Sequence, residues 1–143
     1  MAIKERNQHL RVIAEILTVH LPEHLEDDPD LARDLLSVAG TALLSIYEDA
    51  EKSAKAWDKR AYDLRADELR REWDWALGAS NYALGLALRP QPLQQSDIDK
   101  LRRLIRPELE KPARRQIPDP DRFRGATQAV RHQQAQRKKP VRW

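Results

Sequence analysis

The 143-residue chain contains no cysteine, which excludes disulfide bonds, thiolate nucleophiles and cysteine-ligated metal sites. It also lacks an apolar run near the roughly 20 residues that a membrane-spanning helix requires. No apolar segment of signal-peptide length follows Met1, so we expect a soluble, cytoplasmic protein. Its length corresponds to about one domain.

Proline is absent from Leu31 to Arg89, because all nine prolines lie outside this window. Proline removes a backbone donor and clashes with the preceding helical turn, so its absence permits one helical layer here. A single rod over this window would be about 88 Å long and would bury its apolar stripe only as a homodimer. A break near Asp49–Lys55 or Asp58–Ala61 would instead form an antiparallel hairpin, which is the arrangement we prefer. Neither position is marked by glycine or proline.

Helical spacing of apolar residues supports this layer. Spacings of three and four predict one buried face that contains Leu31, Leu35, Val38, Ala42, Ile46 and Ala50. Asp28 followed by Pro29 is a typical helix start, and Gly40 within the stripe indicates close packing. Residues 75–88 are apolar nearly all round and rich in small side chains, which predicts a buried helix.

Shorter elements flank the proline-free window. We predict a first helix from Lys4 to His20 that Leu21-Pro22 ends, and a short helix that Ser96 caps and that stops before Pro107. Beyond it, apolar residues become scarce. The predicted fold is all-α: an antiparallel hairpin or bundle of three to four helices in residues 1–106, followed by an extended or disordered basic arm in residues 107–143. Residues 125–139 have the composition of a helix that forms on a partner.

Charge divides the chain into an acidic body and a basic arm. Residues 1–88 contain 11 Lys/Arg against 17 Asp/Glu, whereas residues 89–143 contain 15 against 6. A basic arm attracts nucleic acid, anionic membranes or acidic protein surfaces, and charge alone does not distinguish them.

The arm is the main candidate contact surface, because arginine suits planar recognition of carboxylate or phosphate. A protein partner would use apolar anchors as well, whereas nucleic acid would use the cations for phosphate contacts; a solubilising tail is the third interpretation. The candidate partner-binding residues are Arg114, Arg115, Arg122, Phe123, Arg124, Arg131, Arg137, Lys138, Lys139, Arg142 and Trp143.

A second candidate surface lies in the tryptophan-rich stretch of residues 57–75. Its aromatic side chains interleave with arginines, which is typical of a stacking surface for a nucleotide, a pigment or a peptide. Helical spacing favours a simpler interpretation, in which the core anchors are Trp57, Ala61, Leu64, Leu69 and Trp73. The contact residues that then remain are Arg60, Tyr62, Arg65 and Arg70.

The run of residues 56–75, AWDKRAYDLRADELRREWDW, also resembles a motif in small, uncharacterised helical proteins of cyanobacteria. The resemblance covers these 20 residues only. It implies a bacterial cytoplasmic protein, and it implies no catalytic residue.

Histidines and carboxylates do not form a convincing catalytic or metal-binding pattern. His20 and His24 have the four-residue spacing of helical zinc ligands, but Pro22 lies between them, so we expect a solvated loop and no metal. Carboxylates are abundant, and a pair without a pocket carries no evidence of catalysis. There is no glycine-rich phosphate loop and no nucleophile elbow. We therefore expect no catalytic residue and no cofactor.

The sequence as a whole favours a non-catalytic adaptor, assembly factor or regulatory subunit. It would bind an acidic or multisubunit protein partner through the basic arm. The alternative is a nucleic-acid-binding protein that uses the same arm, and the third interpretation is an enzyme or ligand carrier at the tryptophan-rich helix.

Overall fold

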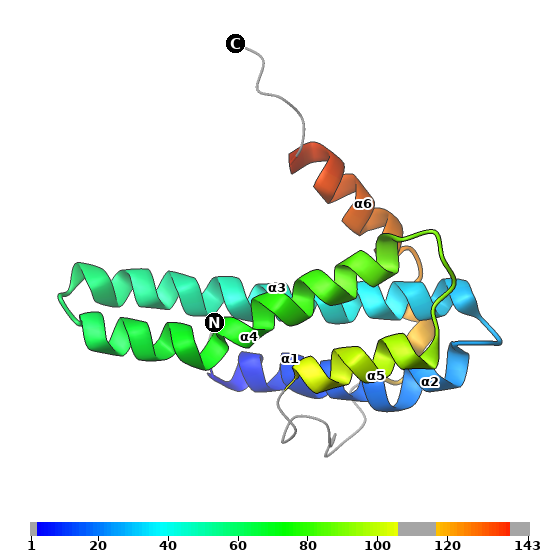
Figure 1. Ribbon diagram of the computed structural model, residues 1–143, viewed down its shortest axis with the longest axis horizontal. Coiled ribbons are helices and arrows are strands. Elements are labelled where there is room, and N and C mark those ends of the chain that lie inside the picture. The colour runs from blue at the N-terminus through cyan, green and yellow to red at the C-terminus, as the bar shows by residue number, and fades with distance from the viewer. Residues whose placement is uncertain (1–2, 106–116, 138–143) are drawn as a thin grey trace, which may run out of the picture.

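The computed structural model describes residues 3–105 and 117–137 of the chain. Within these ranges every regular element is a helix, which confirms the all-α prediction. Two long helices, α3 (Pro29–Lys59) and α4 (Asp63–Leu88), lie side by side and run in opposite directions (Figure 1). The shorter helices pack against this pair.

The break between the two long helices is a tight turn over Arg60–Tyr62. It lies at the second of the two predicted places, near Asp58–Ala61. Ala61 adopts a positive φ of 61°, and the Tyr62 amide donates to the Trp57 carbonyl at 2.9 Å. Alanine takes this left-handed conformation at a cost of about 1–2 kcal/mol, so the turn forms without the glycine that would have marked it in the sequence.

Gly40 places the two long helices in close contact, as its position in the apolar stripe predicted. Its missing side chain leaves room for Leu84 and Ala83 of α4. At the same level Ser80 donates a hydrogen bond from its hydroxyl to the Gly40 carbonyl, at 2.9 Å, although both residues are buried. The layer is therefore held by small residues at the contact as well as by larger apolar ones.

The N-terminal segment contradicts the prediction that Leu21-Pro22 ends the first helix. α1 (Ile3–Glu15) continues into a π-helical turn, η1 (Ile16–His20), and then into α2 (Leu21–His24). In η1 the Leu21 amide donates to the Ile16 carbonyl, five residues earlier. This wider turn lies directly before Pro22, where it relieves the clash of the proline ring with the preceding turn. The helix therefore continues past Pro22 to His24.

α1 packs against α3, and α5 (Gln95–Leu104) packs against α4. α5 begins two residues earlier than predicted, with Gln94 rather than Ser96 at its cap, and Asp97 accepts a hydrogen bond from the Gln94 amide. The largest fully buried apolar side chains come from α1, η1, α2, α3, α5 and the segment before η3; they are Ile13, Ile16, Leu21, Leu35, Leu36, Leu43, Ile46, Ile98, Leu101 and Ile117.

The segment 117–137 differs from the predicted extended or disordered arm, and its helix lies within residues 125–139, where the composition predicted one on binding a partner. It forms a short 3-10 turn, η3 (Pro120–Phe123), and a helix, α6 (Ala126–Arg137), both in contact with α3 (Figure 1). Gly125 between them has φ of 92°, a value that favours glycine. Ile117 and Val130 are buried. The remainder of the predicted arm, 107–116 and 138–143, lies outside the described residues.

Candidate functional site

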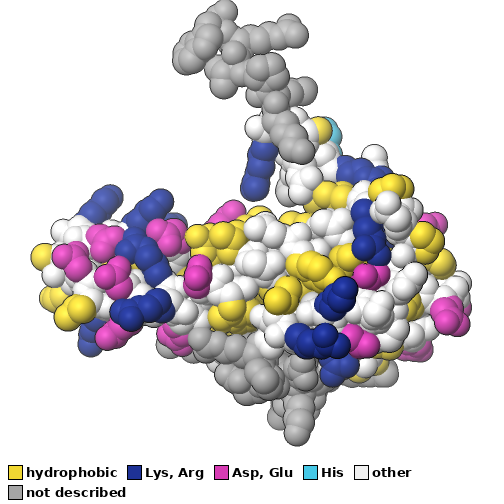
Figure 2. Space-filling view, in the orientation of Figure 1, with side chains coloured by type: hydrophobic (Ala, Val, Ile, Leu, Met, Phe, Trp, Pro, Cys, Tyr) yellow, Lys and Arg dark blue, Asp and Glu magenta, His cyan; other side chains and the backbone are white. Residues whose placement is uncertain are grey.

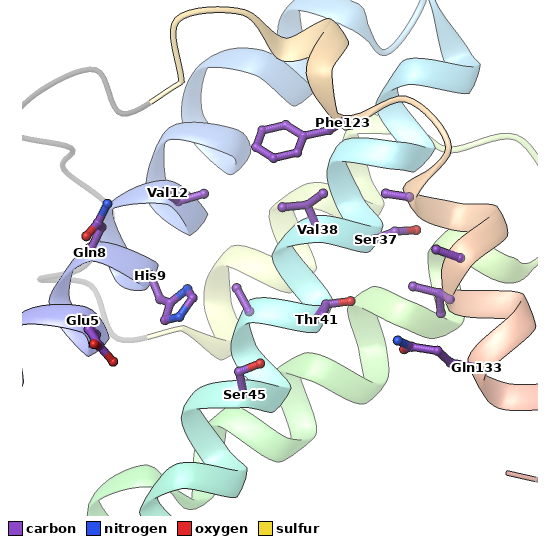
Figure 3. Close-up of a pocket in the computed structure, with 14 residues that line it drawn as sticks. Glu5, Gln8, His9, Val12, Ser37, Val38, Thr41, Ser45, Phe123 and Gln133 are labelled. Atoms are coloured by element: carbon purple, nitrogen blue, oxygen red, sulfur yellow. The ribbon is translucent and has the colours of Figure 1, made fainter. Parts of the chain in front are cut away.

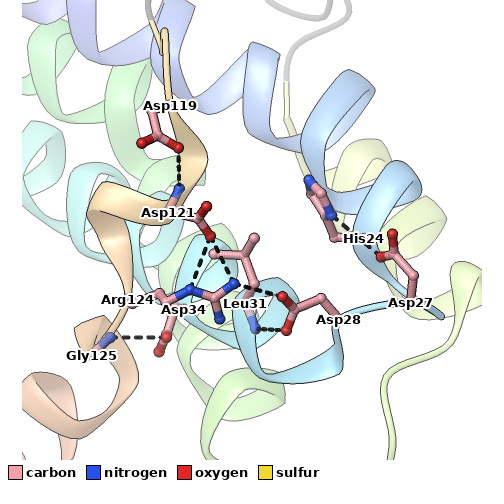
Figure 4. Close-up of polar contacts among 9 residues, drawn as sticks. All are labelled: His24, Asp27, Asp28, Leu31, Asp34, Asp119, Asp121, Arg124 and Gly125. Carbon is pink, nitrogen blue, oxygen red and sulfur yellow. Dashed lines mark hydrogen bonds and ion pairs between the residues drawn. The ribbon is translucent and has the colours of Figure 1, made fainter.

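Polar contacts join the start of α6 to the start of α3 (Figure 4). The Asp34 carboxylate accepts from the Gly125 amide at 2.9 Å and from the Thr127 amide at 3.0 Å, so it caps α6 from another helix. The Ser37 and Thr127 hydroxyls lie 2.9 Å apart in a buried hydrogen bond. We call these contacts, together with the Arg124 ion pairs described next, the α6 latch.

Arg124 completes the α6 latch with two ion pairs. Its guanidinium lies 2.6 Å from an oxygen of Asp28 and 2.7 Å from an oxygen of Asp121. These bonds raise the pKa of Arg124. The bond from Arg124, and then that from the Leu31 amide, lower the pKa of Asp28 below its ordinary value of 3.8. Asp28 therefore caps α3, as predicted, and also holds the chain before α6.

An open groove of about 610 Å³ lies along α3 beside the α6 latch (Figure 3). α3 forms its floor, α1 one wall and α6 the other. Phe123 points into the space between α1 and α3 (Figure 3). The lining residues are Glu5, Gln8, His9, Val12, Ser37, Val38, Thr41, Ala42, Ser45, Phe123, Ala126, Ala129, Val130 and Gln133.

The groove, which we call the α1–α3–α6 groove, is polarised along its length. Val12, Val38 and Phe123 gather near its α6-latch end (Figure 3). Glu5, His9, Ser45 and Gln133 lie toward the other end. A groove whose lining is largely apolar at one end and more polar at the other suits an amphipathic ligand.

The candidate partner-binding residues predicted on the arm occupy different environments in the structure. Phe123 lines the groove, and the Arg122 guanidinium lies 5.6 Å from its ring centroid. Arg124 pairs within the chain, whereas Arg131 and Arg137 are exposed on α6. The others lie outside the described residues: Arg114, Arg115, Lys138, Lys139, Arg142 and Trp143.

The second predicted surface lies at the tip of the α3–α4 hairpin, where basic and acidic side chains intermix at the left of Figure 2. Arg60 and Arg65 are exposed, and Tyr62 is 57% exposed. Arg70 instead joins the two helices, with its guanidinium nitrogens 3.3 Å from Glu51 and 2.7 Å from Asp58. Its hydrogen bonds to Asp58 and then to Glu51 raise its pKa.

The tryptophan-rich stretch is mostly core, in agreement with the preferred interpretation, but two predicted anchors are wrong. Leu69 and Trp73 are buried and Trp57 packs against the core, whereas Ala61 and Leu64 are exposed. The turn at Arg60–Tyr62 changes the phase of the apolar stripe, so α4 buries Ala66 in place of Leu64.

The aromatic rings of this stretch contact each other and α1. Trp73 and Trp75 have ring centroids 6.0 Å apart, and the Arg6 guanidinium lies over Trp73 at 4.8 Å. Trp73 is only 7% exposed. This ring therefore packs within the protein.

His20 is another correction, because it is buried rather than in a solvated loop. Its Nε2 lies 2.7 Å from Glu15 Oε2, and the same oxygen accepts from the Ile117 amide at 3.1 Å. Glu15 and His20 are five residues apart, which places them on one side of a π turn and not of an α-helix. The helical spacing rules therefore missed the pair.

Sequence reasoning also missed Asp34, Ser37 and Thr127, which belong to the α6 latch. Asp34 and Thr127 are 93 residues apart, and no local pattern joins them. The nearest signal is the Gly125-Ala-Thr127 sequence, which is compatible with a helix start.

Within the described ranges, no group of three or more His, Asp or Glu side chains is arranged to hold a metal ion. None of the helices in those ranges is both long and apolar enough to cross a membrane. Comparisons with protein-family models, curated proteins and solved structures found no match to this chain. The resemblance of residues 56–75 to helical proteins of cyanobacteria stays a prediction.

Proposed function

We propose that this protein is a non-catalytic adaptor, assembly factor or regulatory subunit that binds an amphipathic helix of an acidic protein partner. The α1–α3–α6 groove is the proposed docking site. The observation that carries the proposal is the largely apolar lining of this groove, to which α3 contributes Val38 and Ala42 between the walls formed by α1 and α6 (Figure 3).

The dimensions of the groove suit a helix. Its floor runs along α3 from Ser37 to Ser45, positions eight steps apart, which is about 12 Å at 1.5 Å per residue. That length accommodates about two turns of a partner helix. An amphipathic helix would place apolar anchors at i, i+3 or i+4, and i+7 against such a floor. The anchor nearest Val38 and Phe123 would be the most deeply buried.

Charge supports an acidic partner. Residues 117–137 contain four arginines and two aspartates. The two aspartates precede α6, and Asp121 is paired with Arg124. α6 itself contains Arg131 and Arg137 but no acidic residue. Arg137 follows Val130 and Gln133 at spacings of seven and four, which puts it on the groove-facing side of the helix. A partner with carboxylates beside its apolar stripe would therefore be attracted and oriented.

The arm retains its proposed role in a modified form. α6 contributes an ordered wall of the groove, and the basic residues beyond it, including Lys138, Lys139 and Arg142, would add long-range attraction for an acidic surface.

Site-specific photo-crosslinking in the native host tests this proposal. A photoreactive amino acid at Ser45, on the groove floor, should crosslink one protein partner. The matched control carries the same amino acid at Asn81, which is exposed on α4 and does not line the groove. The crosslink at Ser45 should disappear when Thr41→Trp fills the groove and persist with Asn81→Trp.

Three results would reject or redirect the proposal. The same crosslinked proteins from Ser45 and Asn81 would reject the groove as the docking site. Loss of the crosslink after nuclease treatment would favour the nucleic-acid alternative. A crosslink to a second copy of the chain, with a doubled mass in light scattering, would indicate a homodimer.

A further inference from the structure

α6 is joined to the rest of the protein near one end only. The polar contacts of the α6 latch involve Arg124, Gly125 and Thr127, at or before the first turn of α6. Among the described residues, no hydrogen bond or ion pair joins 128–137 to another element; Gln136 contacts only His132 of the same helix. Figure 1 shows the distal end of α6 directed away from the α3–α4 pair.

Burial in α6 follows the same pattern. Thr127 and Val130 are its buried residues. From Arg131 to Arg137 the side chains are exposed, except that Gln134 is partly covered. Regions with few buried apolar contacts open at much lower free energy than core helices, so α6 is expected to separate locally before α3 and α4 unfold.

Gly125 is suited to act as the hinge for such an opening. It has φ of 92° and nothing within 4 Å of the position a Cβ atom would occupy. Its backbone can therefore change conformation without a steric penalty from neighbouring side chains. The Asp34 carboxylate, which accepts from the Gly125 and Thr127 amides, bridges this hinge to α3.

We infer that α6 opens and closes as a unit about Gly125, and that the α6 latch sets the fraction of molecules in which the α1–α3–α6 groove is complete. In the closed position Ala126, Ala129, Val130 and Gln133 supply one wall of the groove. A partner that requires this wall binds the closed form, so its apparent Kd rises by the reciprocal of the closed fraction. The regulatory consequence rests on the proposed function, but the opening is measurable on the protein alone.

Hydrogen exchange on the full chain tests the opening. In the wild type, amides of residues 129–137 should exchange through a local opening, faster than those of the α3 core between Leu35 and Ala50. Asp34→Asn removes one carboxylate acceptor and the charge beside the α6 N-terminus, and should accelerate exchange in α6 by about tenfold or more. Exchange in α3 should stay unchanged. The matched control is Asp30→Asn, which removes the same charge one turn earlier in α3 and should leave α6 exchange within about twofold.

Four exchange results would overturn the inference. Exchange of α6 and α3 at one common rate would show that α6 opens only by global unfolding. Exchange in wild-type α6 at the rate of an unstructured peptide would show that no closed state is held. Equal effects of Asp34→Asn and Asp30→Asn would show that charge at the α3 start, rather than the α6 latch, is responsible, and no acceleration by Asp34→Asn would show that the latch does not hold α6.

Distance measurements between spin labels give a second readout. Because the chain contains no cysteine, the labels attach only at the cysteines that are introduced. Spin labels at Glu48→Cys and Ala135→Cys, both exposed, span α3 and α6. Their distance distribution should contain a closed and an open population, and Asp34→Asn should increase the open one. A control pair, Glu48→Cys with Asn81→Cys, spans α3 and α4 and should show a single distance in both backgrounds. A single unchanged α3–α6 distance in both backgrounds would overturn the inference.

Failure of the hinge and failure of the docking proposal are distinguishable. If exchange and spin-label data show opening but Thr41→Trp leaves partner capture unchanged, the groove is not the docking site and the hinge stands. If Thr41→Trp abolishes capture while Asp34→Asn alters neither exchange nor capture, the groove binds its partner without a gate.

Discussion

Gly40 of α3 and Leu84 of α4 are in such close contact that a Cβ atom on Gly40 would lie 2.7 Å from Leu84 Cδ2 and 2.8 Å from its Cγ. Gly78 and Gly85 of α4 have nothing within 4 Å of the same position. Only the first of these three glycines is therefore required for packing, and this contact keeps the floor of the groove against α4.

A Gly40→Val variant should lose about 1–3 kcal/mol of unfolding free energy, because the added side chain overpacks the α3–α4 contact. Gly78→Ala should gain about 0.5–1 kcal/mol, since alanine favours the helix and meets no neighbour there. Urea denaturation followed by helical circular dichroism measures both. Partial recovery of Gly40→Val by Leu84→Ala would locate the clash, and a stabilising Gly40→Val would contradict it.

Glu15→Ala should destabilise the protein by about 3 kcal/mol. Glu15 is 1% exposed, and its carboxylate contacts His20 and the Ile117 amide, which would both lose a buried partner. The matched control is Glu48→Ala at an exposed position of α3, for which a change within about 0.5 kcal/mol is expected. Similar losses in the two variants would show that the buried contacts are not what stabilises this region.

Leu64 and Leu69 lie five residues apart on α4, and substitutions at the two positions should differ greatly in their effect on stability. Leu64 is 76% exposed, so Leu64→Gln should change the unfolding free energy by less than about 0.5 kcal/mol. Leu69 is 9% exposed, and Leu69→Ala should cost about 2–4 kcal/mol through lost burial and a cavity. Thermal and urea unfolding of the two variants decide the point; a large loss for Leu64→Gln would mean that the tip is covered in solution.

The Arg124–Asp28 contact should weaken in acid. The hydrogen bond from Arg124 holds the pKa of Asp28 below 3.8, so the folded state favours the ionised carboxylate. Its stabilising contribution is complete above the unfolded value, near pH 4, and is lost as pH falls through the lower folded value. Carboxyl NMR titration of Asp28 checks this directly, and Arg124→Gln should return its pKa toward 3.8. An unshifted Asp28 in the wild type would exclude the ion pair.

Much of the α3–α4 layer could be predicted from the sequence, because it depends on short-range rules. Proline placement bounded the long helices, Asp28-Pro29 marked a start, and the stripe through Leu35 and Ile46 identified the buried face. The sequence limited the hairpin turn to two places, near residues 49–55 or 58–61. Which of the two forms the turn depends on the hydrogen bond from the Tyr62 amide to the Trp57 carbonyl, and the spacing of apolar residues does not reveal this bond.

The candidate site was less predictable. Phe123 was singled out as an apolar anchor on the arm, and it lines the groove. The floor at Val38 was assigned simply to the buried face, because the sequence does not show which part of that face a neighbouring helix leaves open. The Glu15–His20 pair was missed because a π turn changes the helical phase.

By itself, the sequence determined that this protein is all-α, that its long helices lie between Pro29 and Pro90, and that positive charge accumulates toward its C-terminus. These properties follow from local backbone preferences and from composition. Only the tertiary structure decided that the start of α6 packs against α3 and that a groove remains beside it. It also decided that Asp34 accepts a hydrogen bond from the Thr127 amide, 93 residues away. The reason is physical: capping, burial and concavity at this site depend on residues that meet in space, and no local pattern in the chain encodes which ones meet.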